Sequence, residues 1–167
     1  MVTTVVEDIE VERARAIVSV IPDPEIPVIT IADLGVLRGV ERRGDTIVVT
    51  LTPTYTGCPA TLAIRMDVET ALTIAGISNV RIDTVLAPAW STDDISDEGR
   101  AKLHAYGIAP PTRRVGKGGL LSPDAAIACP RCGSTASERI SEFGSTPCKA
   151  LWRCKSCREP FDVFKCL

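Results

Sequence analysis

Two Cys-x-x-Cys pairs near the end of this 167-residue chain constrain its fold more than any other feature. The pairs consist of Cys129 with Cys132 and of Cys154 with Cys157, and 21 residues separate them. Each pair curls the backbone so that two thiolates face one point, and four thiolates in a tetrahedron suit a Zn²⁺ ion. The spacing therefore predicts a structural zinc ion at the centre of a C-terminal four-cysteine zinc-ribbon module. Such a metal would supply stability that so short a segment cannot obtain from its few apolar side chains.

Alternatives remain open for the seven cysteines of the chain. Two disulfides or unrelated buried thiols are the structural alternatives, and an iron–sulfur cluster also takes four thiolates. Cys148 and Cys166 lie close enough in sequence to serve as extra ligands. The chain opens on an acidic segment without a signal-peptide pattern, and no apolar run approaches the roughly 18 residues of a membrane span. We therefore expect no membrane contact and a reducing cytoplasm, where thiols ligate metals or do chemistry.

Charge divides the chain into two regions, although the net charge is only −2. Residues 1–112 hold 9 basic and 16 acidic side chains, a net −7, whereas residues 113–167 hold 10 and 5, a net +5. We predict an N-terminal domain over 1–106, a linker rich in proline and glycine over 107–126, and the ribbon over 127–167. The positive tail could bind nucleic acid, an acidic protein or the N-terminal half of its own chain.

Hydrophobic periodicity predicts an α+β (α/β) domain in the N-terminal region, with helices packed on a short mixed sheet. Aromatic residues make up only 4% of the chain, so the core of this domain must be built from aliphatic side chains. Helices are expected at residues 7–20, 59–75 and 93–105, and strands at residues 37–41, 46–51 and 80–86.

Cys58 is the one cysteine far from the ribbon, in the segment Thr54-Tyr-Thr-Gly-Cys-Pro-Ala60. Pro59 suits the first position of a helix, so Cys58 is expected at a helix N-terminus, where free N–H groups and the helix dipole favour a thiolate over a thiol. The segment predicts an accessible nucleophile or metal ligand, and the alternative is a cysteine packed beneath the helix. His104 is the only histidine and lies on a predicted helix, so no Cys-His or Ser-His-Asp set points to acyl transfer or hydrolysis.

Three carboxylates, Asp23, Glu25 and Asp33, lie in or near a proline-rich loop after the first predicted helix. Carboxylates in such loops commonly cap helices or face water. The functional alternative is that they form the wall of a pocket beside Cys58.

The chain resembles the iron–sulfur assembly family that includes SufT in two segments, Asp23-Pro-Glu-Ile-Pro-Val-Ile-Thr-Ile-Ala-Asp-Leu-Gly-Val-Leu37 and Thr52-Pro-Thr-Tyr-Thr-Gly-Cys-Pro-Ala60. Four further segments are similar to the PaaD branch of that family, the accessory subunits of the phenylacetyl-CoA epoxidase system of aerobic phenylacetate breakdown. These segments are Leu86-Ala-Pro-Ala-Trp90, Tyr106-Gly-Ile-Ala-Pro-Pro111, Phe143-Gly-Ser-Thr-Pro-Cys-Lys-Ala150 and Glu159-Pro-Phe-Asp-Val-Phe-Lys-Cys166. The resemblance covers about residues 10–166.

The resemblance implies an accessory maturation factor for a multicomponent oxygenase, and not an enzyme. It places Cys58 on the family's Gly-Cys-Pro cysteine, which holds or passes iron–sulfur clusters. It also places Asp23 and Glu25 on the acidic loop motif, and Thr54 on the threonine of the cysteine loop. The implied partners are the oxygenase and reductase subunits of the epoxidase system, with the iron–sulfur reductase as recipient. Asp94 stands where such sequences usually carry a tryptophan, a departure that bears on a local contact surface.

Carrying a cluster on one cysteine needs further ligands, because a cluster takes about four from protein. The resemblance therefore also implies a homodimer, a small thiol, or thiolates supplied by the recipient.

Other classes of function compete with this one. A zinc-ribbon binding module for nucleic acid or protein would use the basic tail, but the tail lacks a dense stripe of Lys and Arg, and its four aromatic residues are mostly needed as core. A thiol enzyme would use Cys58 as its nucleophile, and an electron carrier would hold iron in the tail.

Overall fold

The computed structural model describes residues 8–111 and 127–165 of the chain. Contacts within the chain divide it into two compact units, Met1–Trp90 and Ser91–Leu167, which are described here one after the other. Among the described residues, no helix is both long enough and apolar enough to cross a bilayer.

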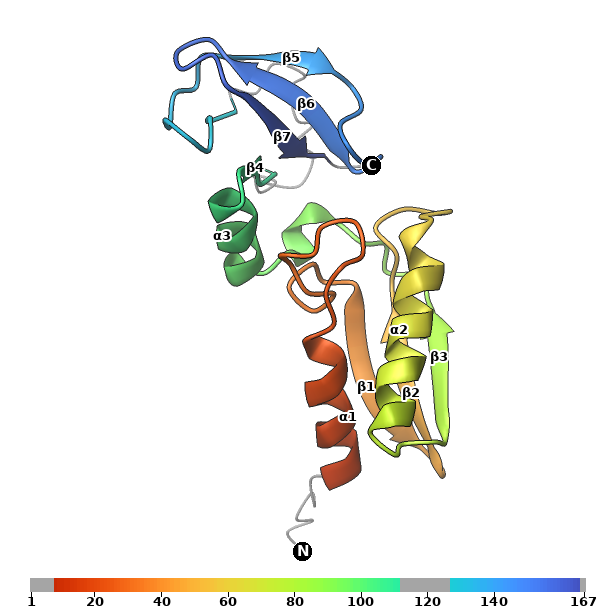
Figure 1. The fold of residues 1–167 in the computed structure, drawn as a ribbon. Coiled ribbons are helices and arrows are strands. Elements are labelled where there is room, and N and C mark those ends of the chain that lie inside the picture. Colours follow the sequence, from red (N-terminus) through yellow and green to blue (C-terminus); the bar gives the residue numbers. More distant parts are fainter. Residues whose placement is uncertain (1–7, 112–126, 166–167) are drawn as a thin grey trace, which may run out of the picture. The chain divides into compact units, whose positions relative to one another are not determined.

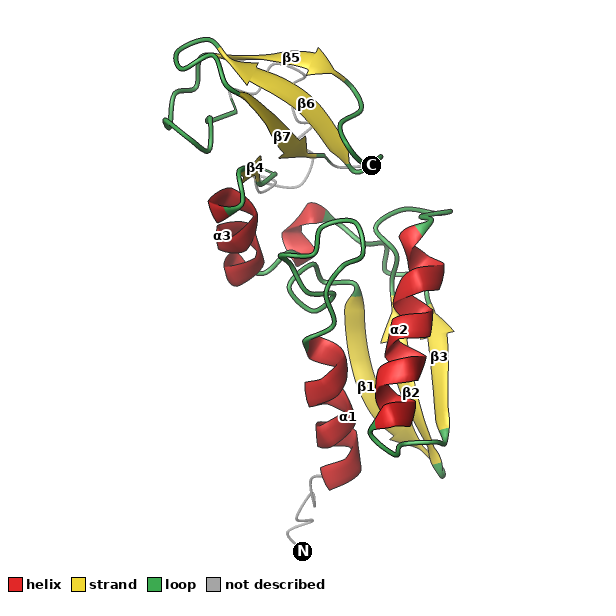
Figure 2. Ribbon diagram, viewed as in Figure 1, coloured by secondary structure: helices red, strands yellow, loops and turns green. Residues whose placement is uncertain are grey.

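The first unit is a three-stranded mixed sheet with two helices packed on it, as predicted (Figures 1 and 2). The strands are β1 (Leu37–Arg43), β2 (Thr46–Leu51) and β3 (Val80–Thr84), and the helices are α1 (Ile9–Ser19) and α2 (Ala60–Ile74). The sheet has the order β1-β2-β3, in which β1 pairs with β2 antiparallel and β2 pairs with β3 parallel. The parallel step requires a crossover connection, and α2 provides it.

Strand β2 is central and covered on both faces, which explains why its sequence does not alternate between apolar and polar residues. Ile47, Val48 and Val49 follow one another and are each exposed by 1% or less. Helix α2 presents one stripe to this core, because its buried residues recur every four positions. They are Ala60, Ile64, Val68 and Leu72.

An ion-pair cluster fixes the start of α1. Asp8 caps the helix by accepting hydrogen bonds from the backbone N–H groups of Glu10 and Val11. Arg42 of β1 donates to the carboxylates of both Asp8 and Glu10. The hydrogen bond from Arg42 holds the pKa of Asp8 at about 2, below its ordinary value of 3.8.

The second unit contains a four-stranded sheet of order β4-β7-β6-β5, preceded by two short helical segments. Strand β4 pairs with β7 in parallel, and the other pairs are antiparallel. The elements are η1 (Thr92–Asp94), α3 (Asp97–Ala105), β4 (Ile108–Ala109), β5 (Ser137–Ser141), β6 (Lys149–Cys154) and β7 (Pro160–Phe164).

Two details of this unit differ from the sequence-based expectation. The single helix expected at 93–105 is divided, because Ser96 accepts a hydrogen bond from the N–H of Gly99 and so starts a new helix. Ile108 and Ala109, expected in the linker, instead form β4 through pairing with β7. Residues 112–126 of the expected linker lie outside the described residues, and the domain boundaries given above stay predictions.

Candidate metal centre and thiol loop

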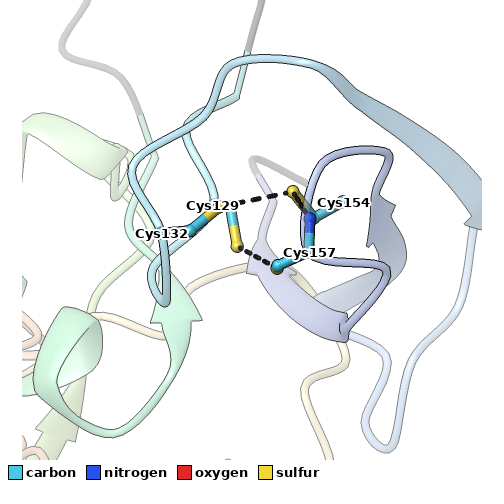
Figure 3. A group of neighbouring side chains, drawn as sticks. All are labelled: Cys129, Cys132, Cys154 and Cys157. Carbon is cyan, nitrogen blue, oxygen red and sulfur yellow. Dashed lines mark hydrogen bonds between the residues drawn. The ribbon is translucent and has the colours of Figure 1, made fainter.

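Four cysteine sulfurs converge in the second unit (Figure 3). The Sγ atoms of Cys129, Cys132, Cys154 and Cys157 all lie within 4.8 Å of one another. Cys129 Sγ lies 3.8 Å from Cys157 Sγ, and Cys132 Sγ lies 3.5 Å from Cys154 Sγ. These two contacts join the two pairs to each other, so the four cysteines form one group.

Each pair sits on a tight turn, and the two turns are alike. In the first turn, the N–H of Gly133 donates to the carbonyl of Cys129 at 2.8 Å. In the second turn, the N–H of Cys157 points at the sulfur of Cys154 at 3.5 Å. The residue after the second cysteine adopts the left-handed conformation in both turns, with φ of 73° at Gly133 and 65° at Arg158. We call these two turns the first and the second knuckle.

The knuckles bury one sulfur each and leave the other near the surface. Cys129 and Cys154 are 1% and 0% exposed, whereas Cys132 and Cys157 are exposed. The buried pair packs with a small apolar cluster that also contains Ala109, Phe161 and Val163, with Ile127 and Trp152 against it. The sulfur group thus forms part of the core of the ribbon, as expected where a bound ion replaces a larger apolar core.

The electrostatics of the group call for a cation. The backbone N–H of Cys157 stabilises the thiolate of Cys154 and lowers its pKa to about 6. The N–H of Glu159 has the same effect on Cys157, but burial and the neighbouring sulfurs outweigh it and raise the pKa of Cys157 to about 12. The neighbouring sulfurs thus oppose ionisation of Cys157, and a bound cation would stabilise its thiolate. The four-cysteine group is a metal-binding site.

Cys148, a further cysteine of the tail, does not belong to this group. Cys148 is buried, and its sulfur lies 3.1 Å from the hydroxyl of Thr146. Within the described residues, only the four knuckle cysteines form the group of close ligand atoms. Cys166 lies outside those residues.

Cys58 lies in the loop between β2 and α2, two residues before the first residue of the helix. Its N–H donates to the carbonyl of Tyr55 at 3.2 Å, and its carbonyl accepts from the N–H of Thr61 at 3.1 Å. Its side chain is partly exposed and its thiol is free. Gly57 has φ of 85°, a conformation that favours glycine and lets the loop turn just before the cysteine. Thr54, in the same loop, is half-buried.

In the acidic loop, residues 22–35, the carboxylates of Asp23 and Asp33 accept hydrogen bonds from backbone N–H groups of the loop itself. Asp23 is 5% exposed, and its Oδ1 accepts from the N–H groups of Glu25 at 2.9 Å and Ile26 at 2.8 Å. Asp33 and Thr30 make a similar reciprocal arrangement, in which each side chain accepts from the other's N–H. Asp23 and Asp33 therefore stabilise turns within this loop. His104 lies exposed on α3.

Sequence reasoning missed Arg158 as a residue of interest. A signal was present in the sequence, because the first knuckle has glycine at the equivalent position. Comparing Cys129-Pro-Arg-Cys-Gly133 with Cys154-Lys-Ser-Cys-Arg158 would have drawn attention to the arginine.

Comparison with known proteins agrees with this division of the chain. Residues 11–85 match the iron–sulfur cluster assembly protein family, and residues 114–165 match the PaaD zinc beta ribbon domain. The fold and the sulfur group thus define a class of protein in which an iron–sulfur assembly domain is joined to a metal-binding ribbon.

A full-length relative identifies the particular family. The chain is 48% identical, over 95% of its length and 94% of the relative's, to a protein of Escherichia coli (strain K12) that is named as one subunit of a "Putative 1,2-phenylacetyl-CoA epoxidase". The chain therefore belongs to the PaaD family.

Two solved structures match part of the chain. A domain of unknown function (DUF59) from Bacillus anthracis is 26% identical, with a TM-score of 0.51 over 56% of this chain and 91% of that one. A Mycobacterium tuberculosis protein associated with [Fe-S] complex assembly and repair is 34% identical over 59% of this chain and 83% of that one, with a TM-score of 0.34.

Proposed function

We propose that this protein is a non-catalytic maturation factor, which carries iron–sulfur clusters on Cys58 and delivers them to a phenylacetyl-CoA epoxidase system. The recipient is the iron–sulfur reductase component of that system. Membership of the PaaD family and the match of residues 11–85 to iron–sulfur assembly proteins support this proposal.

The observation that carries the proposal is the position of Cys58. Its thiol is free and partly exposed, and it lies outside the four-cysteine group in a loop that ends at a helix N-terminus. A thiol in this position can reach an external partner. Thr54 shares this loop, whereas Asp23 and Glu25 lie in the acidic loop, where Asp23 caps the backbone. We assign Thr54, Asp23 and Glu25 to shaping the surroundings of the thiol.

Transfer by ligand exchange keeps atoms and electrons in balance. Cys58 supplies one of about four thiolates that a cluster takes, and a second copy of the chain or a small thiol supplies the others. A deprotonated cysteine of the recipient attacks an iron atom, and a new Fe–S bond forms as the bond to Cys58 breaks. The proton that the recipient cysteine lost to solvent is matched by protonation of the released Cys58 thiolate. No oxidant or reductant is needed for this exchange.

We assign zinc to the four-cysteine site. Four sulfurs at about 2.3 Å from one ion lie about 3.8 Å from each other. The separations of 3.8 and 3.5 Å, and the upper limit of 4.8 Å, fit a single ion. In a cluster the same four sulfurs would bind separate iron atoms and would lie further apart. This site would be structural, and Cys58 would be the transferring thiol.

Replacing Cys58 tests the proposal in cells that lack the native protein. We expect Cys58→Ala to fold and to keep its tail metal but to leave phenylacetyl-CoA epoxidation at the level of the empty control. Cys148→Ala is the matched control, because it removes a cysteine outside the metal group and is expected to support epoxidation. Full epoxidation with Cys58→Ala would contradict the carrier role. The cluster content of the purified reductase from the same cells shows whether a loss of activity arises at the proposed step.

A further inference from the structure

Two cysteines of the metal centre are buried and two are exposed, so the four ligands differ in their access to small reagents. Cys129 and Cys154 are 1% and 0% exposed, whereas Cys132 lies exposed on the first knuckle. Oxidation of cysteine depends on thiolate character and on exposure, and a cysteine that binds metal is a thiolate. Cys132 therefore combines the two properties that make a sulfur react with a peroxide.

A second sulfur lies where it can react with an oxidised Cys132. Cys154 Sγ belongs to the second knuckle and lies 3.5 Å from Cys132 Sγ (Figure 3). A disulfide bond is about 2 Å long, so the two sulfurs need to approach each other by only about 1.5 Å. Burial shields Cys154 from an oxidant in solution, but an attack on its neighbour needs no access to solvent.

Hydrogen bonds link the two knuckles next to these sulfurs. Ser134 Oγ lies 2.8 Å from Ser156 Oγ, and the N–H of Lys155 donates to the carbonyl of Ala136 at 2.7 Å. Ser134 and Ala136 follow the first knuckle cysteines in sequence, whereas Lys155 and Ser156 lie between the two cysteines of the second knuckle. These contacts limit the separation of the two sulfurs while a bond forms between them.

We propose that Cys132 is an oxidation site, at which hydrogen peroxide converts the metal centre into a Cys132–Cys154 disulfide and releases the ion. The Cys132 thiolate attacks one oxygen of the peroxide, so that an S–O bond forms and the O–O bond breaks as hydroxide leaves. The Cys154 thiolate then attacks the Cys132 sulfur, so that an S–S bond forms and the S–O bond breaks with loss of a second hydroxide. Two protons from solvent convert the hydroxides to water, and the two sulfurs supply the two electrons that reduce the peroxide.

Release of the ion follows from the number of ligands. The disulfide removes two of the four thiolates that hold a zinc ion in a structural site. Cys129 and Cys157, whose sulfurs lie 3.8 Å apart, are a second pair that the same reaction can join. Reduction of a disulfide restores its thiols, so the centre responds to peroxide reversibly. The reaction uses the zinc assigned above and does not involve Cys58, so it and the proposed cluster transfer can fail independently.

A disulfide map of the full-length, zinc-loaded protein tests this proposal. Trypsin cleaves after Arg131 and Lys155, among other sites, so each of the four cysteines lies on its own peptide and every pairing has its own mass. After peroxide treatment and alkylation of the remaining thiols, we expect the Cys132–Cys154 bond and the loss of one zinc ion per chain to a chromogenic chelator. Dithiothreitol with added zinc should restore the loaded protein.

Cys148→Ala is the matched control, because it removes a tail cysteine outside the metal group and should change the rate of zinc release less than twofold. Cys58 has a free, partly exposed thiol and serves as an internal reference for the extent of oxidation. Zinc that stays bound when Cys58 is fully oxidised would overturn the proposal. Release that is abolished in Cys58→Ala would also overturn it, because oxidation would then begin at Cys58.

Two further results concern the order and the pairing of the sulfurs. Bonds within a knuckle, Cys129 to Cys132 or Cys154 to Cys157, in place of the bond between knuckles would overturn the proposal. Dimedone added with the peroxide traps sulfenic acid, the form of cysteine that carries the new S–O bond. Dimedone on the Cys132 peptide is the expected result, whereas dimedone on the Cys154 peptide in its place would overturn the assignment of Cys132 as the site of attack.

Discussion

Substituting the residue that follows the second cysteine of each knuckle measures the free-energy cost of its left-handed backbone conformation. Arg158 and Gly133 have nearly the same φ, 65° and 73°, in turns of the same kind. A residue with a Cβ atom in this conformation costs about 1–2 kcal/mol, whereas glycine loses roughly 0.5–1 kcal/mol more in backbone entropy on folding. The difference predicts that Arg158→Gly stabilises the ribbon by about 0–1.5 kcal/mol.

The reverse change at the first knuckle should have the opposite sign. A Cβ atom built on Gly133 would have no heavy atom within 4 Å, so Gly133→Ala creates no clash and changes only the backbone energy. We expect it to destabilise the ribbon by about 0–1.5 kcal/mol. The double variant Gly133→Ala with Arg158→Gly should then lie close to the wild-type protein, because the two sites belong to separate turns.

Urea-induced release of the bound metal, which is zinc on the proposed function, reports on the ribbon alone in a chain of two units; a chromogenic chelator follows it. The midpoints of the two single variants should move in opposite directions at equal slope. Destabilisation of the ribbon by more than about 1 kcal/mol in Arg158→Gly would refute the reasoning, because the arginine side chain would then contribute a stabilising contact.

Two other perturbations test separate parts of the structure. Removing the metal with a strong chelator, or protonating its ligands with acid, should unfold β5, β6 and β7 while leaving the first unit folded, because cysteine binds metal only as the thiolate. Amide hydrogen exchange measures this unfolding. Continued protection of those strands in the metal-free protein would contradict the prediction. Arg42 lowers the pKa of Asp8 to about 2, so the pair stabilises the folded state above the ordinary pKa of 3.8 and loses this effect as the pH falls towards 2. The free energy of unfolding should therefore fall more steeply between pH 4 and pH 2 in the wild-type protein than in Asp8→Asn. Equal slopes in the two proteins would exclude the pair as the cause.

Local patterns predicted the parts of this fold that local forces determine. The apolar run of β2, the proline before α2 and the glycine after it each act within a few residues, and the observed elements Thr46–Leu51 and Ala60–Ile74 agree with the prediction. The four-cysteine group was predictable for the same reason, because each knuckle is a short turn and only one long-range step joins the two. The division of the helix near residue 96 was missed although its signal is local. Ser96 could have been identified as an N-cap with Gly99 three residues later.

Long-range pairing accounts for the features that sequence reasoning missed. Strand β4 consists of two residues, and only its pairing with β7, more than fifty residues later, makes it a strand. The ion pair between Glu138 and Arg153 depends on the register of β5 and β6, which sets these two residues opposite each other. A shift of one residue would place these two side chains on opposite faces, and no local pattern fixes that register. Charge counting found the basic tail but could not show which of its cations pair with carboxylates.

Holding a metal and passing one on require opposite arrangements of sulfur. The knuckles place four thiolates around one point, and two of them are buried in the ribbon core. Loss of the ion would expose that core and leave the four thiolates to repel one another. A cluster that is to be transferred must instead leave the carrier. A carrier that supplied every ligand of the cluster would retain it, as the knuckles retain their ion. On the proposed function, Cys58 suits transfer because the chain offers one free, partly exposed thiol there and leaves the remaining ligand positions to others. The recipient can then displace the carrier one bond at a time, and the structural metal is not drawn into the exchange.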